Sequence, residues 1–398
     1  MRVAIIGNMN NNANNLIRYL RAAGIDAELL FYCHEADHFV PAADNIEEAD
    51  YPSRVLSWGG YKRLYFIPAS KIAEDLAEFD FLIGSRLAPA YVRKGRRQLD
   101  LFMPSGGDLH MLPMFSGFVP KDLFKFIFFS RWQKLGIRQS RCLYWDATNN
   151  ELERKIQPVV SGLRRISHAI PAIYYPDYQG RNLEKRLEVS KWRDRFEAAR
   201  GDADYLLFHH VKHVWLPKTI THYGKFHEKG NDQIIKGLRL FYDQNPEKKI
   251  RIIMFEFGVD HAETRKLAQD LDVDQHIAWF PQMERKELMI GIHFSDAVIG
   301  EITRSWFSYG TIFEAMVMSK PVIHHRNDKY YAKKKLYPMI DVRDDISISN
   351  AFKRISEDKI DLKKLGQEAN KWLTEYGVGE PISQIIDMIH SKAKAIHA

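Results

Sequence analysis

The chain of 398 residues is too long for one ordinary hydrophobic core, and a prior of about 150 residues per domain favours two or three domains. Hydrophobic residues at 45% and charged residues at 27% are typical of a globular protein in water, and no apolar run reaches the roughly 18 residues of a membrane span. Two cysteines exclude a disulfide framework, while the net charge of +7 is compatible with anionic partners.

The chain opens with a pattern typical of a strand-loop-helix unit. Residues 3–6 are an apolar strand that Gly7 and Asn8 close, and an asparagine-rich loop leads into a helix. The loop lacks G-x-G-x-x-G, so we expect no tightly bound dinucleotide. Gly7 and Asn8 are instead candidates for contact with an acceptor or a sugar. A strand in place of an apolar leader predicts a cytoplasmic protein.

A second candidate loop follows the apolar run 99–103. It contains Ser105, Gly106, Gly107 and Asp108 at the carboxyl end of an expected strand, where ligands gather in open α/β sheets. Asp108 is either a hydrogen-bond anchor for an acceptor or a helix cap, and the pattern favours neither.

Basic residues gather in two segments of the first half. Arg93, Lys94, Arg96 and Arg97 form a short run, and residues 121–138 interleave cations with aromatic side chains. The second segment predicts either contact with an anionic membrane face or a core helix with solvated cations. The chain carries no nucleic-acid-binding signature, so nucleic acid is not an expected partner.

The second half alternates short apolar runs with helical patterns. Such alternation predicts a parallel sheet covered by helices. The charge-dense residues 181–200 predict a surface helix or a linker between the halves. The predicted organisation is a first domain at 1–180, the linker at 181–200, a second domain at 201–380, and a C-terminal helix at 381–398 that can pack back on the first domain.

The stretch SYGTIFEAMVMSKPVI, residues 308–323, indicates a turn, a helix and a strand. Gly310 leaves the backbone open where the helix begins, so that free N–H groups and the positive helix end can face an anion. Glu314 lies one turn further along, and Pro321 ends the helix before an apolar strand. Taken alone, the unit is also compatible with any α/β crossover in which Gly310 and Glu314 are structural.

This stretch resembles the nucleotide-sugar site of family-4-like GT-B glycosyltransferases, on its glycine turn, its E-A-M helix and its S-K-P-V-I strand. The resemblance implies that Glu314 binds the ribose hydroxyls of the donor and that backbone amides at Gly310 and Thr311 hold its phosphates. The chain departs from the family at Trp306, where a second glutamate usually contacts the donor sugar. Similarly, Ser105 stands in place of the histidine of the family's H-G-x-D turn.

The phrase EKGNDQIIKGL resembles the same family's phosphate-binding helix start. The resemblance implies that Lys229, with Lys212 in place of the usual arginine, holds the donor pyrophosphate, and Lys225 is a rival for this role. Fixed cations can stabilise a leaving diphosphate without a metal. Glu256, at the end of an expected strand, is a further candidate for donor contact.

Five histidines crowd the neighbouring loop, at 209, 210, 213, 222 and 227. Their spacing matches no known zinc or iron signature, so we expect no metal. The only small molecule that the resemblance implies is the nucleotide-sugar substrate, and no cofactor is expected.

The resemblance implies two Rossmann-like doubly wound parallel-sheet domains facing a cleft. It also implies a retaining, metal-independent glycosyltransferase of hexosyltransferase type, which transfers a sugar from a UDP-linked donor to a glycan or lipid-linked acceptor, as in polysaccharide biosynthesis. Peripheral contact with an anionic inner membrane face stays open. Two alternatives remain: a non-catalytic nucleotide-sugar-binding subunit, and a GT-B nucleotide-sugar epimerase.

Overall fold

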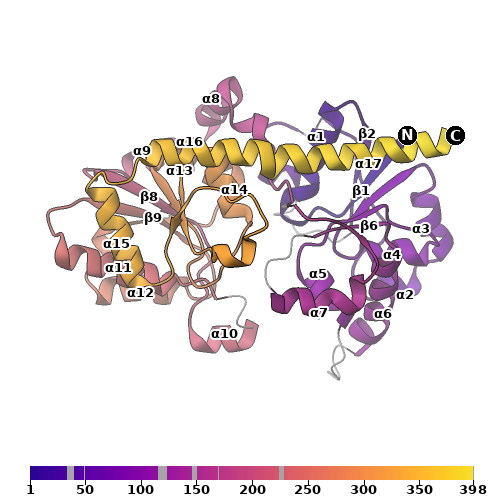
Figure 1. Ribbon diagram of the computed structural model, residues 1–398, viewed down its shortest axis with the longest axis horizontal. Helices are drawn as coiled ribbons and strands as arrows, with labels where there is room; N and C mark the ends of the chain where they lie inside the picture. Colours follow the sequence, from indigo (N-terminus) through magenta and orange to yellow (C-terminus); the bar gives the residue numbers. More distant parts are fainter. Residues whose placement is uncertain are drawn as a thin grey trace. The chain divides into compact units, whose positions relative to one another are not determined.

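The computed structural model describes residues 1–33, 40–48, 50–114, 123–145, 150–168, 170–223 and 228–397. The chain divides into two compact units, residues 1–174 with 376–398 and residues 175–375. Each unit is a parallel sheet covered by helices (Figure 1). The predicted pair of doubly wound α/β units is confirmed.

The sheet of the first unit has seven parallel strands in the order β3-β2-β1-β4-β5-β6-β7. Their bounds are β1 Arg2–Ile6, β2 Asp26–Phe31, β3 Ser53–Val55, β4 Phe81–Gly84, β5 Leu101–Phe102, β6 Cys142–Tyr144 and β7 Arg164–Ile166. The central strands β1 and β4 are buried on both faces, which explains their continuous apolar sequences. Strand β3 has three exposed residues, so no apolar pattern reveals it in the sequence, whereas the three residues of β6 are buried.

The helices of the first unit are α1 Asn12–Ala22, α2 Arg63–Phe66, α3 Ala69–Asp75, α4 Ala88–Lys94, α5 Gly107–His110, α6 Leu123–Gln139, α7 Asn150–Val160 and α17 Glu380–His397. Helix α6 packs closely on α4. A Cβ atom at Gly136 would lie 2.0 Å from the carbonyl oxygen of Pro89, so this approach requires glycine. Phe129 and Ile137 of α6 are buried, which makes the described part of the 121–138 segment a core helix.

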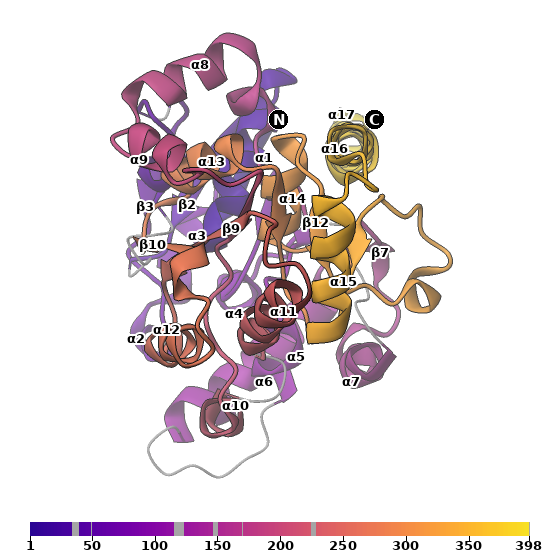
Figure 2. The ribbon, with the colours of Figure 1, turned by 90° about the vertical axis from the view of Figure 1, so that its left-hand side faces the viewer.

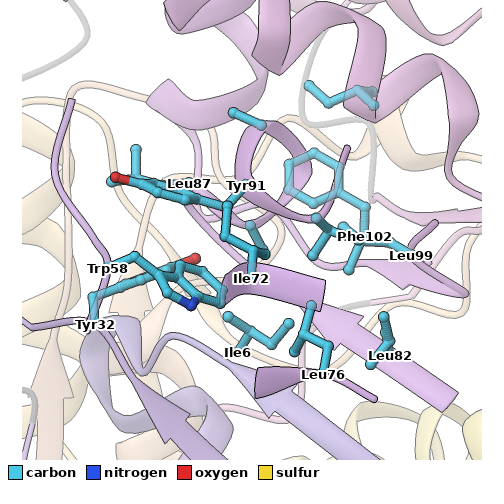
Figure 3. Packing of buried hydrophobic residues seen from close by; sticks show 14 of the residues in the cluster. Ile6, Tyr32, Trp58, Ile72, Leu76, Leu82, Leu87, Tyr91, Leu99 and Phe102 are labelled. Atoms are coloured by element: carbon cyan, nitrogen blue, oxygen red, sulfur yellow. The ribbon is translucent and has the colours of Figure 1, made fainter. Parts of the chain in front are cut away.

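Aromatic side chains organise the core of the first unit (Figure 3). The fully buried rings of Trp58 and Tyr91 stack with their centroids 4.8 Å apart. Their polar tips are satisfied, because Trp58 Nε1 donates to Asp75 Oδ2 at 2.9 Å and the Tyr91 hydroxyl donates to the Gly60 carbonyl at 2.6 Å. The core therefore buries these large rings without leaving a polar group unpaired.

The sheet of the second unit has six parallel strands in the order β10-β9-β8-β11-β12-β13. Their bounds are β8 Tyr205–His209, β9 Ile250–Glu256, β10 Ile277–Pro281, β11 Ala297–Ile299, β12 Val322–His324 and β13 Ile340–Asp341. The strands predicted at the positions of β8 to β12 are confirmed. Chain order reverses between β8 and β11, so this sheet has a switch point at which open α/β folds bind ligands.

The helices of the second unit are α8 Gly180–Val189, α9 Arg193–Ala198, α10 Pro217–Tyr223, α11 Asn231–Gln244, α12 His261–Asp270, α13 Arg285–Phe294, α14 Gly310–Val317, α15 Asp345–Ser356 and α16 Leu362–Trp372. Helices α11, α12 and α15 lie on one side of this sheet and α13 and α14 on the other (Figure 2).

Helices α8 and α9 occupy the segment predicted as a surface helix or linker. Phe196 of α9 is buried, and its ring stacks on Phe280 with the centroids 4.7 Å apart. The segment therefore belongs to the second unit. The buried Phe196 packs this segment against the second unit, and the many charged residues around it made the segment look like a linker in the sequence.

Candidate functional site

Four of the predicted donor residues, Lys229, Gly310, Thr311 and Glu314, lie at the edge of the second sheet where its strands end, called here its C-terminal edge. Helix α14 begins at Gly310 at this edge, after β11, and helix α11 begins at Asn231, after β8. Gly310 has ordinary helical backbone rather than a positive φ, and a Cβ atom there would lie 3.5 Å from Glu314 Oε1. Gly310 therefore leaves space beside the carboxylate of its own helix.

Glu314 is a buried carboxylate with two cationic or proton-donating partners. Arg285 Nε lies 2.8 Å from Oε1, and His210 Nε2 lies 2.7 Å from Oε2. Burial by itself raises the pKa of Glu314, but the attraction of Arg285 and the hydrogen bond from His210 outweigh it and lower the pKa to about 2. Glu314 is therefore ionised, and its partners orient it.

His210 connects Glu314 to the start of α14. An ionised carboxylate only accepts hydrogen bonds, so Nε2 of His210 carries a proton. The Thr311 hydroxyl lies 3.4 Å from the same nitrogen. The other nitrogen, Nδ1, is buried and has no hydrogen-bond partner among the described residues. When the ring is neutral, Nδ1 is therefore a buried hydrogen-bond acceptor, while Nε2 of the same ring contacts the anionic carboxylate.

Lys229 forms a second ion pair at this edge. Its Nζ lies 2.7 Å from Glu301 Oε1, and its backbone N–H donates to the Val214 carbonyl at 2.9 Å. Glu301 Oε2 is buried without a hydrogen-bond partner in the described part of the chain. The Glu301 amide donates to the Tyr309 hydroxyl at 2.7 Å, immediately before α14, so this pair is tied to the same helix start. Sequence reasoning missed Glu301, although it lies two residues after the buried strand β11.

The other predicted donor residues are more scattered. Lys212 is exposed, with Nζ 6.0 Å from the centre of the Phe257 ring beyond β9. Glu256 is exposed and pairs with Arg265 at 3.1 Å, as an ordinary surface ion pair does. Lys225 lies outside the described residues. Among the predicted donor residues, Thr311 and Glu314 both contact His210, and Gly310 lies beside the Glu314 carboxylate.

Two histidines next to this site, His209 and His213, are neutral structural groups. His209 Nδ1 donates to the Ile299 carbonyl at 3.0 Å, and its Nε2 accepts from Asn231 at 3.0 Å, which joins β8, β11 and α11. Burial lowers the pKa of His209 to about 4 and that of His213 to about 3. Among the described residues, no three histidine, cysteine, aspartate or glutamate side chains gather as metal ligands.

In the first unit, Asp108 accepts hydrogen bonds from backbone groups rather than from a cation. The Arg86 amide donates to Oδ2 at 2.9 Å and the Ser105 amide to Oδ1 at 2.9 Å. Gln133 of α6 donates to the carbonyls of both Arg86 and Asp108. Burial raises the pKa of Asp108 to about 6, against the effect of these bonds. Asp108 therefore ties the loops after β4 and β5 together.

Gly7 and Asn8 shape the C-terminal edge of the first sheet. Gly7 has φ +83°, and a Cβ atom there would lie 2.6 Å from Tyr32 Cε2. Asn8 is fully buried; its side chain donates to Asn11 Oδ1 at 2.7 Å and accepts from the Asn14 amide at 2.9 Å. Gly7 and Ser105 line one small cavity of about 20 Å³. Gly106, with φ +120°, and Gly107 continue from Ser105 into α5.

Among the described residues, no helix combines the length and the apolar character needed to cross a membrane.

No family model and no curated protein sequence matches the chain. Solved structures match it along nearly its whole length. Anabaena HepE in complex with UDP and glucose superposes with a TM-score of 0.63 at 15% identity, over 98% of this chain and 99% of that one. A glycosyltransferase from Rickettsia africae gives a TM-score of 0.65 at 12% identity, over 99% and 98%.

The chain has the GT-B fold. The same fold includes UDP-GlcNAc 2-epimerase from Neisseria meningitidis, which superposes with a TM-score of 0.58 at 15% identity, over 98% of this chain and 100% of that one. A GT-B architecture thus accommodates more than one reaction, and the reaction must be argued from the site residues.

Proposed function

We propose that the chain is a glycosyltransferase that uses a nucleotide diphosphate sugar, with UDP as the nucleotide. The observation that carries the proposal is the ionised Glu314, oriented by Arg285 and His210 at the start of α14. Glu314 lies at the C-terminal edge of the second parallel sheet, and open α/β folds bind ligands at this edge, near the switch point in strand order. The similarity to HepE, solved with UDP and glucose, supports the choice of nucleotide.

In this proposal Glu314 accepts hydrogen bonds from the ribose hydroxyls. Each carboxylate oxygen can accept more than one hydrogen bond, so Oε1 and Oε2 keep capacity after bonding Arg285 and His210. The two partners therefore position the carboxylate for the ribose. Glu256 and its exposed ion pair are a further candidate for contact with the donor.

Lys229 and Lys212 hold the diphosphate, with Lys225 as a rival, and the amides of Gly310 and Thr311 contribute the positive end of α14. A diphosphate carries more negative charge than one carboxylate, so it competes with Glu301 for Lys229. The lysines then stabilise the leaving diphosphate without a metal or any other cofactor.

The acceptor is a glycan or a lipid-linked glycan in this proposal, and the first unit contacts it through Gly7, Asn8 and the 105–107 loop. Asp108 acts as a positioning residue for that loop, because its carboxylate already receives backbone hydrogen bonds. Transfer retains the anomeric configuration, with the leaving phosphate accepting the proton of the incoming hydroxyl.

A second candidate function is nucleotide-sugar epimerisation. The buried His210 supports it, because a carboxylate on Nε2 and an unpartnered Nδ1 acceptor form a proton-transfer pair. Incubation with UDP-N-acetylglucosamine in the absence of an acceptor separates the reactions, since only an epimerase yields an isomeric nucleotide sugar. A protein that binds UDP but turns over with no acceptor is instead a binding subunit.

The first experiment is a thermal-shift titration with UDP, GDP, ADP and CMP, with and without EDTA. Ligand at about 100 times Kd stabilises the native state by about 2.7 kcal/mol. We expect an EDTA-insensitive shift with UDP that Glu314→Gln abolishes. Glu247→Gln is the control, since it removes an exposed carboxylate that precedes β9, at the opposite edge of the same sheet. No shift with any nucleotide would contradict the donor site.

A further inference from the structure

A basic cleft lies at the opposite edge of the first sheet, where its strands begin. It has a volume of about 560 Å³ and is lined by Arg93, Arg96, Arg97, Gln98, Arg138, Gln139, Ser140, Arg141, Gly162 and Leu163. Most of these residues immediately precede β5, β6 or β7. The cleft is therefore distinct from the cavity lined by Gly7 and Ser105, which lies where strands of the same sheet end. We call it the arginine cleft.

Five arginines and no aspartate or glutamate stand among the described residues that line the arginine cleft. One carboxylate beside the cleft is that of Asp100, 3.5 Å from Arg141 Nε. Asp100 is shared, because Lys392 of α17 lies 2.7 Å from its Oδ1 and the Leu82 amide donates to its Oδ2. The positive charge of the cleft is therefore largely uncompensated.

Neutral acceptors hold two of these guanidinium groups in place. Arg97 donates to the carbonyls of Leu76 at 2.8 Å and Phe79 at 2.7 Å, and Arg138 donates to the Pro158 carbonyl at 2.8 Å. Carbonyl partners orient a guanidinium without cancelling its charge. Like charges fixed together repel one another, and a bound anion relieves this repulsion.

Arg96 occupies a backbone position that ordinarily favours glycine. Its φ is +55°, directly after the end of α4, and Gly95 beside it has φ −71°. A non-glycine residue is disfavoured in this region, because its Cβ atom approaches the following carbonyl oxygen. The chain thus keeps a guanidinium at the cleft where a glycine would be less strained.

We propose that the arginine cleft binds a ligand carrying two or more adjacent phosphate groups. Guanidinium forks match phosphate oxygens in pairs, and the volume exceeds what a single phosphate fills. Leu163 is the one apolar side chain among the described lining residues, and none is aromatic, so the cleft offers no platform for stacking a base. The ligand class is therefore a polyphosphate group, either free in solution or on a lipid headgroup.

Isothermal titration calorimetry with inorganic tripolyphosphate tests the proposal, at low salt and with UDP saturating the second unit. The test variant is Arg96→Gly with Arg138→Gln; the first change relieves backbone strain and the second alters an exposed side chain, so the fold is retained. The control is Arg181→Gln with Arg354→Gln, which removes the same charge from exposed helices. We expect binding about tenfold weaker in the test variant than in the control.

A second arm distinguishes the two sources of phosphate. The same proteins are sedimented with phosphatidylcholine vesicles that contain a phosphatidylinositol bisphosphate. Vesicle binding that the test variant loses, and that tripolyphosphate displaces, supports a lipid headgroup. Tripolyphosphate binding without vesicle binding supports a soluble ligand. Absence of binding in both arms, or equal loss in the test and control variants, would overturn the proposal.

Discussion

The C-terminal edges of the two sheets include the buried carboxyl groups of Asp108 and Glu314, and these two groups behave in opposite ways. Asp108 in the first unit is 8% exposed and Glu314 in the second is 6% exposed. Asp108 has backbone donors, and its pKa rises to about 6, whereas Glu314 has Arg285 and His210, and its pKa falls to about 2. Equal burial on the same architecture therefore yields different proton affinities. The charge of the partners decides which of the two carboxyl groups stays ionised.

The largest effect is expected from removing the ion-paired carboxylate. Glu314→Ala removes the buried carboxylate that Arg285 and His210 contact, and loss of one member of a buried ion pair costs about 3–5 kcal/mol. The free energy of unfolding, measured by urea denaturation, should fall by this amount. A loss below about 1 kcal/mol would mean that Arg285 finds another partner and that the pair does not organise the site.

The pH dependence of the free energy of unfolding should have opposite signs for Asp108 and Glu314. The folded-state pKa of Asp108, about 6, exceeds the roughly 3.9 of an unfolded aspartate, so its contribution to stability is present below pH 4 and is lost as pH rises through 6. The free energy of unfolding of Asp108→Asn should therefore rise by about 2–3 kcal/mol relative to that of the parent protein between pH 4 and 6. Urea unfolding at each pH measures this difference.

Glu314→Gln should show the reverse dependence. The folded-state pKa of about 2 lies below the roughly 4.3 of an unfolded glutamate, so its contribution is present above pH 4.3 and is lost as pH falls toward 2. The parent protein should therefore lose stability relative to this variant over that range. Parallel curves for the two variants would refute the assignment of opposite environments.

Alanine substitutions at two glycines predicted as site residues should differ in their effects on stability and on UDP affinity. Gly7→Ala places a Cβ atom 2.6 Å from Tyr32 Cε2 at a positive φ, and we expect a loss of about 2 kcal/mol. Gly310→Ala meets no strain and should change stability by about 0.5 kcal/mol or less. UDP binding should weaken only for Gly310→Ala, since the added methyl group faces Glu314. Calorimetry on both variants measures this, and unchanged UDP affinity for Gly310→Ala would place the phosphates elsewhere.

A further expected effect is on UDP affinity and concerns the second ion pair. Glu301→Gln frees Lys229 for the diphosphate and should tighten UDP binding by about tenfold, while Lys229→Gln should weaken it by a similar factor. Titration calorimetry at one salt concentration compares the two. If both substitutions weaken binding equally, Lys229 acts through its pairing with Glu301 rather than through the nucleotide.

The sequence by itself determined the two parallel sheets and the helix α14 that begins at Gly310 and carries Glu314. Hydrophobic periodicity and helix start signals are local properties of the chain. It left open the role of Asp108 and missed Arg285 and Glu301. Only the tertiary structure decided these, since Glu314 meets His210 across 104 residues of chain and Lys229 meets Glu301 across 72. The pKa of a buried carboxyl depends on such distant partners, and local sequence carries no record of them.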